Sequence, residues 1–130
     1  GELRFEPLSG PLIRRHLSQN QPIISGLSST YLHRVMREYG PDDIEDDIRG
    51  APAGHFVVLC GYDRKEREVL VADPLQSNPH SASRRYSIDI NRVLTSILLG
   101  VLTYDANLLI IENAPGPVAG SSRAQPHRRQ

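Results

Sequence analysis

The sequence is poor in cysteine, in net charge and in long apolar runs, and it contains no tryptophan. Its single cysteine, Cys60, excludes a disulfide framework within the chain and a cysteine-rich zinc site. Acidic and basic residues balance to a formal net charge of zero, which gives no electrostatic reason to expect nucleic acid or an anionic membrane as a partner. The longest apolar run, residues 97–102, is far shorter than the roughly 20 residues of a membrane-spanning helix. We therefore expect a soluble, cytoplasmic protein without a membrane span.

The ends of the chain suggest how it is organised. It begins with Gly1, and no basic-then-apolar signal segment follows, so we expect a processed or truncated piece of a longer protein. A length of 130 residues fits one small domain, which we place at residues 1–114. Residues 115–130 are rich in Pro, Gly, Ser and Arg and are expected to form a disordered tail.

Apolar periodicity predicts a mixed fold. Expected strands lie at residues 3–6, 21–27, 54–62, 68–73, 85–88 and 107–112, and expected helices at 10–18 and 90–99. Ser9 and Asp89 are suited to cap the two helices. Residues 29–38 are ambiguous, with a short helix as one interpretation. The sum is an α+β domain with an antiparallel sheet of four to five strands and packed helices.

Residues 41–50 contain five acidic residues and few apolar ones, which is typical of a solvated surface loop. A calcium site there is the alternative. The glycine and the distal glutamate of an EF-hand loop are missing, so we favour the solvated loop and predict no metal and no cofactor.

The two central strands carry the residues of greatest interest, His55 and Asp73. If the turn between the strands holds an odd number of residues centred on Arg64, His55 lies directly opposite Asp73. Opposite residues have Cβ atoms roughly 4.5–5.5 Å apart and point to the same face. The carboxylate could then accept the Nδ1 proton of the imidazole and leave Nε2 as a base. An even-numbered turn would place them on opposite faces, and the pair could also be an ordinary polar contact.

These strands also resemble a known family. Residues 54–63 read GHFVVLCGYD and residues 69–74 read VLVADP. Together they resemble the GHFVVL-x-GYD and V-x-V-x-DP signature of the double-glycine leader peptidases, bacterial papain-like cysteine peptidases that process bacteriocin leaders. The resemblance extends over about residues 22–112. It implies the C-terminal half of a papain-like fold, with His55 as the general base and Asp73 as the orienting carboxylate.

The sequence departs from that family at the nucleophile. No cysteine precedes His55, where the resemblance places a catalytic cysteine at the start of a helix. Cys60 is five residues further along the same strand, about 16 Å away and on the other face, and we expect it to be a core residue. The upstream hydroxyl residues Ser25, Ser28, Ser29 and Thr30 are weak substitutes. Gln19 and Gln21 are weaker still as counterparts of the oxyanion-hole glutamine.

Other histidines offer little chemistry. His33 could line the same cleft as His55 if its segment folds back there. No pair of histidines has the i, i+4 helical spacing and acidic partner of a zinc site.

Two functional interpretations follow. In the first, the domain hydrolyses peptide bonds of a peptide or protein substrate with a cysteine that lies upstream, outside this chain. In the second, it is a catalytically inactive module that binds peptides. A transglutaminase-like or nucleotide-cyclase-like relative is a third possibility. Because the sheet alone would expose an apolar face, we also expect self-association into a homo-oligomer.

Overall fold

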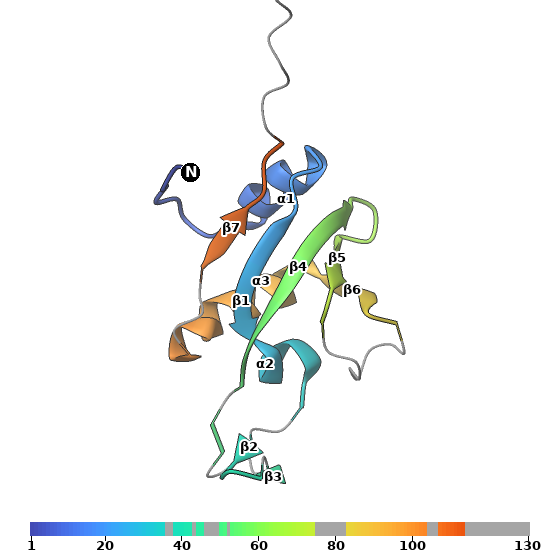
Figure 1. Cartoon of the computed structure of the whole chain (residues 1–130). Coiled ribbons are helices and arrows are strands. Elements are labelled where there is room, and N and C mark those ends of the chain that lie inside the picture. The colour runs from blue at the N-terminus through green and yellow to red at the C-terminus, as the bar shows by residue number, and fades with distance from the viewer. Residues whose placement is uncertain are drawn as a thin grey trace, which may run out of the picture.

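A computed structural model gives the arrangement of the chain (Figure 1) and describes residues 1–35, 38–42, 44–45, 50–51, 53–74, 83–103 and 107–113. The expected disordered tail at residues 115–130 lies outside the described residues. Within them, no helix is long and apolar enough to cross a membrane.

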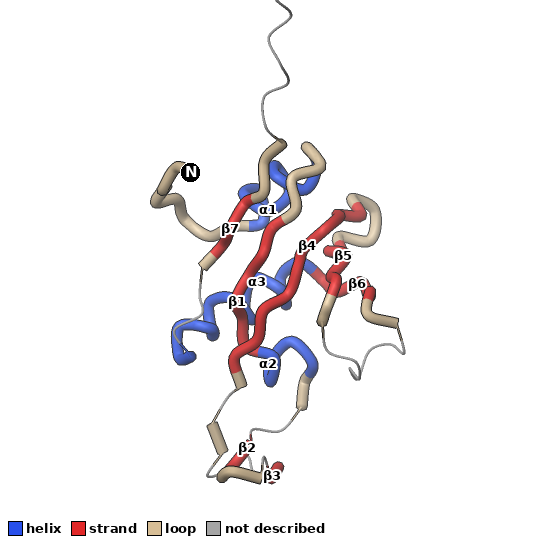
Figure 2. The backbone as a smooth tube through the Cα atoms, in the orientation of Figure 1, coloured by secondary structure: helices blue, strands red, loops and turns tan. Residues whose placement is uncertain are grey.

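The main sheet has five antiparallel strands in the order β6-β5-β4-β1-β7 (Figure 2), which confirms the predicted α+β class. Its strands are β1 (Ile23–Ser28), β4 (Gly54–Asp63), β5 (Glu68–Ala72), β6 (Arg85–Asp89) and β7 (Leu108–Ile110). The helices are α1 (Gly10–Ser18), α2 (Ser29–His33), α3 (Ile90–Leu99) and the 3-10 turn η1 (Gly100–Thr103). The ambiguous segment after β1 therefore contains a short helix.

The expected acidic loop is partly structured. Strands β2 (Glu38–Tyr39) and β3 (Ile44–Glu45) pair there as a small second sheet. Residues 43 and 46–49 lie outside the described residues, and with them most of the carboxylates that a calcium site would need.

Both predicted helix starts are confirmed. The Ser9 hydroxyl accepts the backbone N–H of Leu12 at 3.3 Å. The Asp89 carboxylate accepts the N–H groups of Asn91 and Arg92 at 2.8 and 3.3 Å. Each cap satisfies amides that have no carbonyl partner within the first helical turn.

The strand predicted at residues 3–6 is wrong. This segment has no regular structure, and Leu3 and Phe5 are 80% and 91% exposed. The segment pairs with neither edge strand of the main sheet, β6 or β7.

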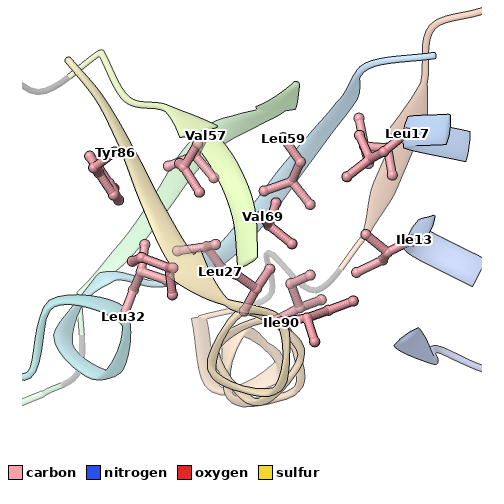
Figure 3. Packing of buried hydrophobic residues seen from close by; sticks show 14 residues of the cluster. Ile13, Leu17, Leu27, Leu32, Val57, Leu59, Val69, Tyr86 and Ile90 are labelled. Atoms are coloured by element: carbon pink, nitrogen blue, oxygen red, sulfur yellow. The ribbon is translucent and has the colours of Figure 1, made fainter. Parts of the chain in front are cut away.

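The core lies between one face of the sheet and the helices (Figure 3). Alternate residues of the strands point into it, as a half-buried sheet requires. Its members are Ile13, Leu17, Ile23, Leu27, Leu32, Val57, Leu59, Val69, Val71, Tyr86, Ile88, Ile90, Val93 and Ile97. Helices α1 and α3 pack on this face and lie behind β1 and β4 in Figure 1. On the other face Phe56 and Leu109 remain 49% and 56% exposed.

Candidate active site

The hairpin of β4 and β5 does not have the register centred on Arg64. Its turn contains four residues, 64–67, because Asp63 pairs with Glu68. An even turn by itself would put His55 and Asp73 on opposite faces of the sheet. Of the two alternatives that the sequence left open, the turn is the even-numbered one.

A β-bulge between Leu59 and Gly61 reverses that outcome. On the His55 side of the bulge, Leu59 pairs with Val71, whereas on the turn side Gly61 pairs with Leu70. The bulge therefore adds one unpaired residue to β4. Asp73 follows β5 and, in the continued register, lies beside Val57 and diagonal to His55. Diagonal neighbours on one face are within reach of long side chains. The expected contact of His55 with Asp73 thus forms in a register that the sequence did not predict.

The same bulge determines the position of Cys60. The prediction of a core residue is wrong, because Cys60 is exposed. Its Sγ–H donates to the carbonyl oxygen of Leu70 at 3.4 Å. His55 points with Leu27 and Val57 to the helix-covered face, so Cys60 lies on the opposite side of the sheet from the imidazole.

Asp73 is held by its backbone as well as by its side chain. Its N–H donates to the carbonyl oxygen of Arg84 at 2.8 Å, which continues the pairing of β5 with β6 by one residue. Pro74 follows, disfavours a helical conformation at Asp73 and has no N–H for a further ladder bond. The Asp-Pro dipeptide therefore ends the strand with the carboxylate pointing into the core side.

The Asp73 carboxylate is the centre of a buried polar cluster, and its side chain is 0% exposed. Nε2–H of His55 donates to Oδ1 at 2.8 Å, and the hydroxyl of Tyr86 donates to Oδ2 at 2.6 Å. Nε2 of His33 lies 3.4 Å from Oδ2, and the His33 ring meets Tyr86 edge-on with centroids 5.8 Å apart. Three elements besides the Asp73 segment thus converge on one carboxylate, as a buried charge requires.

The surroundings of Tyr86 change the pKa of its phenol. Burial, and then the hydrogen bond to the Asp73 carboxylate, raise the pKa of the Tyr86 phenol well above its ordinary value. The hydroxyl therefore remains a donor throughout the physiological pH range. Sequence reasoning predicted a strand here without a role for Tyr86. The available signal was its place two residues before Ile88, on the buried face, where a tyrosine hydroxyl needs a partner.

His33 reaches the cluster because α2 is fastened to the start of β4. The Ser29 N–H and hydroxyl both donate to the carbonyl oxygen of Ala53, at 2.9 and 3.1 Å. The Ala53 N–H donates to the Thr30 hydroxyl at 3.0 Å. Ala53 is two residues before His55, so this link sets the last residue of α2 beside the same carboxylate. His33 and His55 therefore lie beside the same carboxylate, in line with the expectation that the His33 segment folds back toward His55.

The ring nitrogen that contacts the carboxylate is Nε2, and the expectation that Nδ1 would do so is wrong. An ionised carboxylate only accepts hydrogen bonds, so Nε2 must carry a proton. In the neutral ring, Nδ1 is then the nitrogen with the free lone pair. The His55 side chain is 17% exposed and Nδ1 makes no hydrogen bond with the described residues. This nitrogen is the one that could take up a proton.

The weaker candidates have structural roles or lie elsewhere. The Ser28 hydroxyl caps α2, and the Ser25 hydroxyl donates to backbone carbonyl oxygens. Oε1 of Gln21 accepts a hydrogen bond from Nδ1–H of His16 at 2.7 Å, at the end of α1 and far from His55. Among the described residues, no group of three or more His, Cys, Asp or Glu side chains could hold a metal ion.

Comparison with known proteins identifies the family of the chain. No curated protein matches it, and no solved structure matches it. A family model described as the Peptidase_C39 like family matches residues 12–95, a segment that contains β1, α2, the hairpin and β6, and with them all four residues of the carboxylate cluster. Since this match spans more than half of the sequence, the chain belongs to the Peptidase_C39-like family and is a peptidase-like domain.

Proposed function

We propose that His55 and Asp73 are the general base and the orienting carboxylate of a cysteine peptidase whose thiol lies outside residues 1–130. The observation that carries the proposal is the 2.8 Å contact of His55 Nε2 with a carboxylate that is 0% exposed. A buried carboxylate fixes the orientation and the tautomer of the imidazole and stabilises the imidazolium. Tyr86 and His33 hold that carboxylate from its other oxygen.

The chemistry follows from the free lone pair on Nδ1. The base takes the proton of the thiol, and the thiolate attacks the carbonyl carbon of the scissile peptide bond. The amine leaves with the proton from His55, and a thioester remains on the enzyme. Water then attacks the thioester, His55 takes a proton from it, and the acid product and the thiol are released.

Cys60 does not supply this thiol. It lies on the far face of the sheet from the imidazole, about 16 Å along the strand at roughly 3.3 Å per residue. The nucleophile must therefore be delivered to the helix-covered side of His55.

The test uses the complete product of the gene, assayed for hydrolysis of peptides and for inactivation by a thiol-directed inhibitor. We expect inhibitor-sensitive turnover that His55→Ala abolishes while the fold is kept. His16→Gln is the matched control, because His16 is a buried histidine of α1 that lies away from the Asp73 cluster. Turnover retained in His55→Ala would contradict the proposal.

A second candidate function is peptide binding without hydrolysis. One observation favours it: a groove of about 440 Å³ crosses the uncovered face of the sheet. Its lining is mostly apolar and consists of Ile24, Phe56, Val57, Val58, Ala72, Asp73, Pro74, Arg84 and Arg85. Peptide binding by a complete product that shows no turnover, and that Phe56→Ala weakens, would favour this candidate.

A further inference from the structure

A second cavity, far from the Asp73 cluster, has a basic lining. It has a volume of about 890 Å³ and is lined by residues of α1, the end of β4 and the β4–β5 turn. The β4–β5 turn lies at the upper end of β4 in Figure 1. Its lining residues are Pro11, Arg14, Arg15, Ser18, Gln19, Tyr62, Arg64 and Arg67. Tyr62 is seven residues along β4 from His55, which is about 23 Å of extended strand. The cavity is therefore separate from the candidate active site.

The packing of α1 against the core determines which side of the helix lines this cavity. Ile13 and Leu17 are buried in the core, which fixes the rotation of the helix about its axis. Pro11, Arg14 and Ser18 recur at helical spacing on another side, and that side lines the cavity. The core packing therefore fixes the side of the helix from which the Arg14 side chain extends.

The arginines of the lining are mostly without acidic partners. Arg15 pairs with Glu6 at 2.9 Å. Among the described residues, Arg14, Arg64 and Arg67 have no acidic ion-pair partner and no carboxylate lines the cavity. Asp63, at the start of the turn, accepts the backbone N–H groups of residues 65 and 66, at 2.8 and 3.0 Å. Four guanidinium groups around one cavity repel one another, and a bound anion would relieve that repulsion.

Arg67 occupies a backbone conformation that favours glycine or asparagine. Its φ is 58°, in the left-handed region. The Arg67 carbonyl oxygen accepts the N–H of Ile90, the first residue of α3, at 3.0 Å, which holds this conformation in place. The Arg67 side chain, which lines the cavity, therefore extends from a turn whose backbone is held in one conformation.

We propose that this cavity binds a compact phosphate-bearing anion with at least two negative charges, such as a diphosphate. Guanidinium groups match phosphate oxygens because their parallel N–H donors form paired, charge-assisted hydrogen bonds. The volume is within the range of small-molecule sites, about 300–1,000 Å³. Tyr62 adds an aromatic ring to the wall, so the diphosphate could be inorganic or the phosphate end of a nucleotide.

The experiment measures binding of inorganic pyrophosphate and of ADP to the chain by calorimetry, together with the thermal unfolding midpoint. We expect pyrophosphate to bind and to raise the midpoint. Arg14→Gln and Arg64→Gln should each weaken binding by about tenfold or more. Lys65→Gln is the matched control, because Lys65 is on the same turn, is 91% exposed and does not line the cavity.

Arg67→Gly separates loss of binding from loss of folding. Glycine relieves the left-handed strain, so this variant should unfold at a higher temperature than the parent and yet bind pyrophosphate more weakly. Equal affinity for pyrophosphate and ADP indicates an inorganic ligand; tighter ADP binding that Tyr62→Leu removes indicates a nucleotide. The proposal is overturned if neither anion binds, if Lys65→Gln weakens binding as much as Arg14→Gln, or if only an oligonucleotide or acidic peptide binds. None of these results depends on His55.

Discussion

Tyr86→Phe tests the carboxylate cluster with the removal of one oxygen atom. The ring that packs in the core is kept, and only the hydroxyl that donates to Asp73 Oδ2 at 2.6 Å is lost. Hydrogen bonds to charged groups contribute about 1.5–3 kcal/mol. We therefore expect Tyr86→Phe to lower the free energy of unfolding by about 2 kcal/mol at neutral pH. For a chain of this size that corresponds to a fall of roughly 5–10 °C in the unfolding midpoint.

The assay is denaturant unfolding of the parent and the variant, with Tyr31→Phe as the matched control. Tyr31 is 44% exposed, and its hydroxyl makes no hydrogen bond with the described residues. The control should change the free energy of unfolding by less than about 0.5 kcal/mol. A loss in Tyr86→Phe as small as in the control would refute the reasoning, because the buried carboxylate would then not depend on the hydroxyl.

The pH dependence of the same variant provides a second readout. The pKa of Tyr86 is raised above its ordinary value of 10.0, chiefly by burial. Above that pH the unfolded chain loses the phenol proton while the folded chain keeps it, so the unfolded state binds fewer protons and stability falls as pH rises. One proton gives a slope of up to about 1.4 kcal/mol per pH unit. The stability difference between parent and Tyr86→Phe should therefore shrink above pH 10, and parallel curves would contradict the raised pKa.

Three further predictions concern the cap of α3, the exposed cysteine and the uncovered face of the sheet. Asp89→Ala should cost about 1 kcal/mol of unfolding free energy, since the carboxylate caps α3 through two amides; an unchanged denaturation midpoint would disprove that role. Cys60→Ser should change stability by less than about 0.5 kcal/mol, and Cys60 should react with a thiol reagent in the folded protein; a thiol that reacts only after unfolding would contradict its exposed position. The uncovered sheet face should make the chain self-associate, and Phe56→Glu should reduce the associated fraction in sedimentation experiments; a monomer at high concentration would exclude this.

The sequence predicted what local chemistry determines. Ser9 and Asp89 satisfy amides within three residues of themselves, and both helix starts were found at the right place. The Asp-Pro dipeptide likewise marks a strand end through the geometry of its own bonds. Such features depend on a few neighbouring residues and can be recognised in one sequence.

The site geometry depended on features that the sequence does not fix locally. The bulge at Cys60 changes the register of β4 against β5 and so brings Asp73 to the same face of the sheet as His55. Tyr86 meets the carboxylate only because β6 pairs with β5, and His33 only because Ala53 fastens α2. Contacts between distant segments of this kind follow from packing, which no spacing rule within the sequence specifies.

The most direct test of the central claim, that buried Asp73 holds His55 with Nδ1 as the base, is the tautomer of His55. Nitrogen-15 NMR of the imidazole, assigned by comparison with His55→Ala, distinguishes the protonated from the unprotonated ring nitrogen. In the neutral ring the account predicts a proton on Nε2, hydrogen-bonded to Asp73, and a lone pair on Nδ1. A proton on Nδ1 of the neutral ring would contradict it, because Nε2 would then have nothing to donate to the carboxylate.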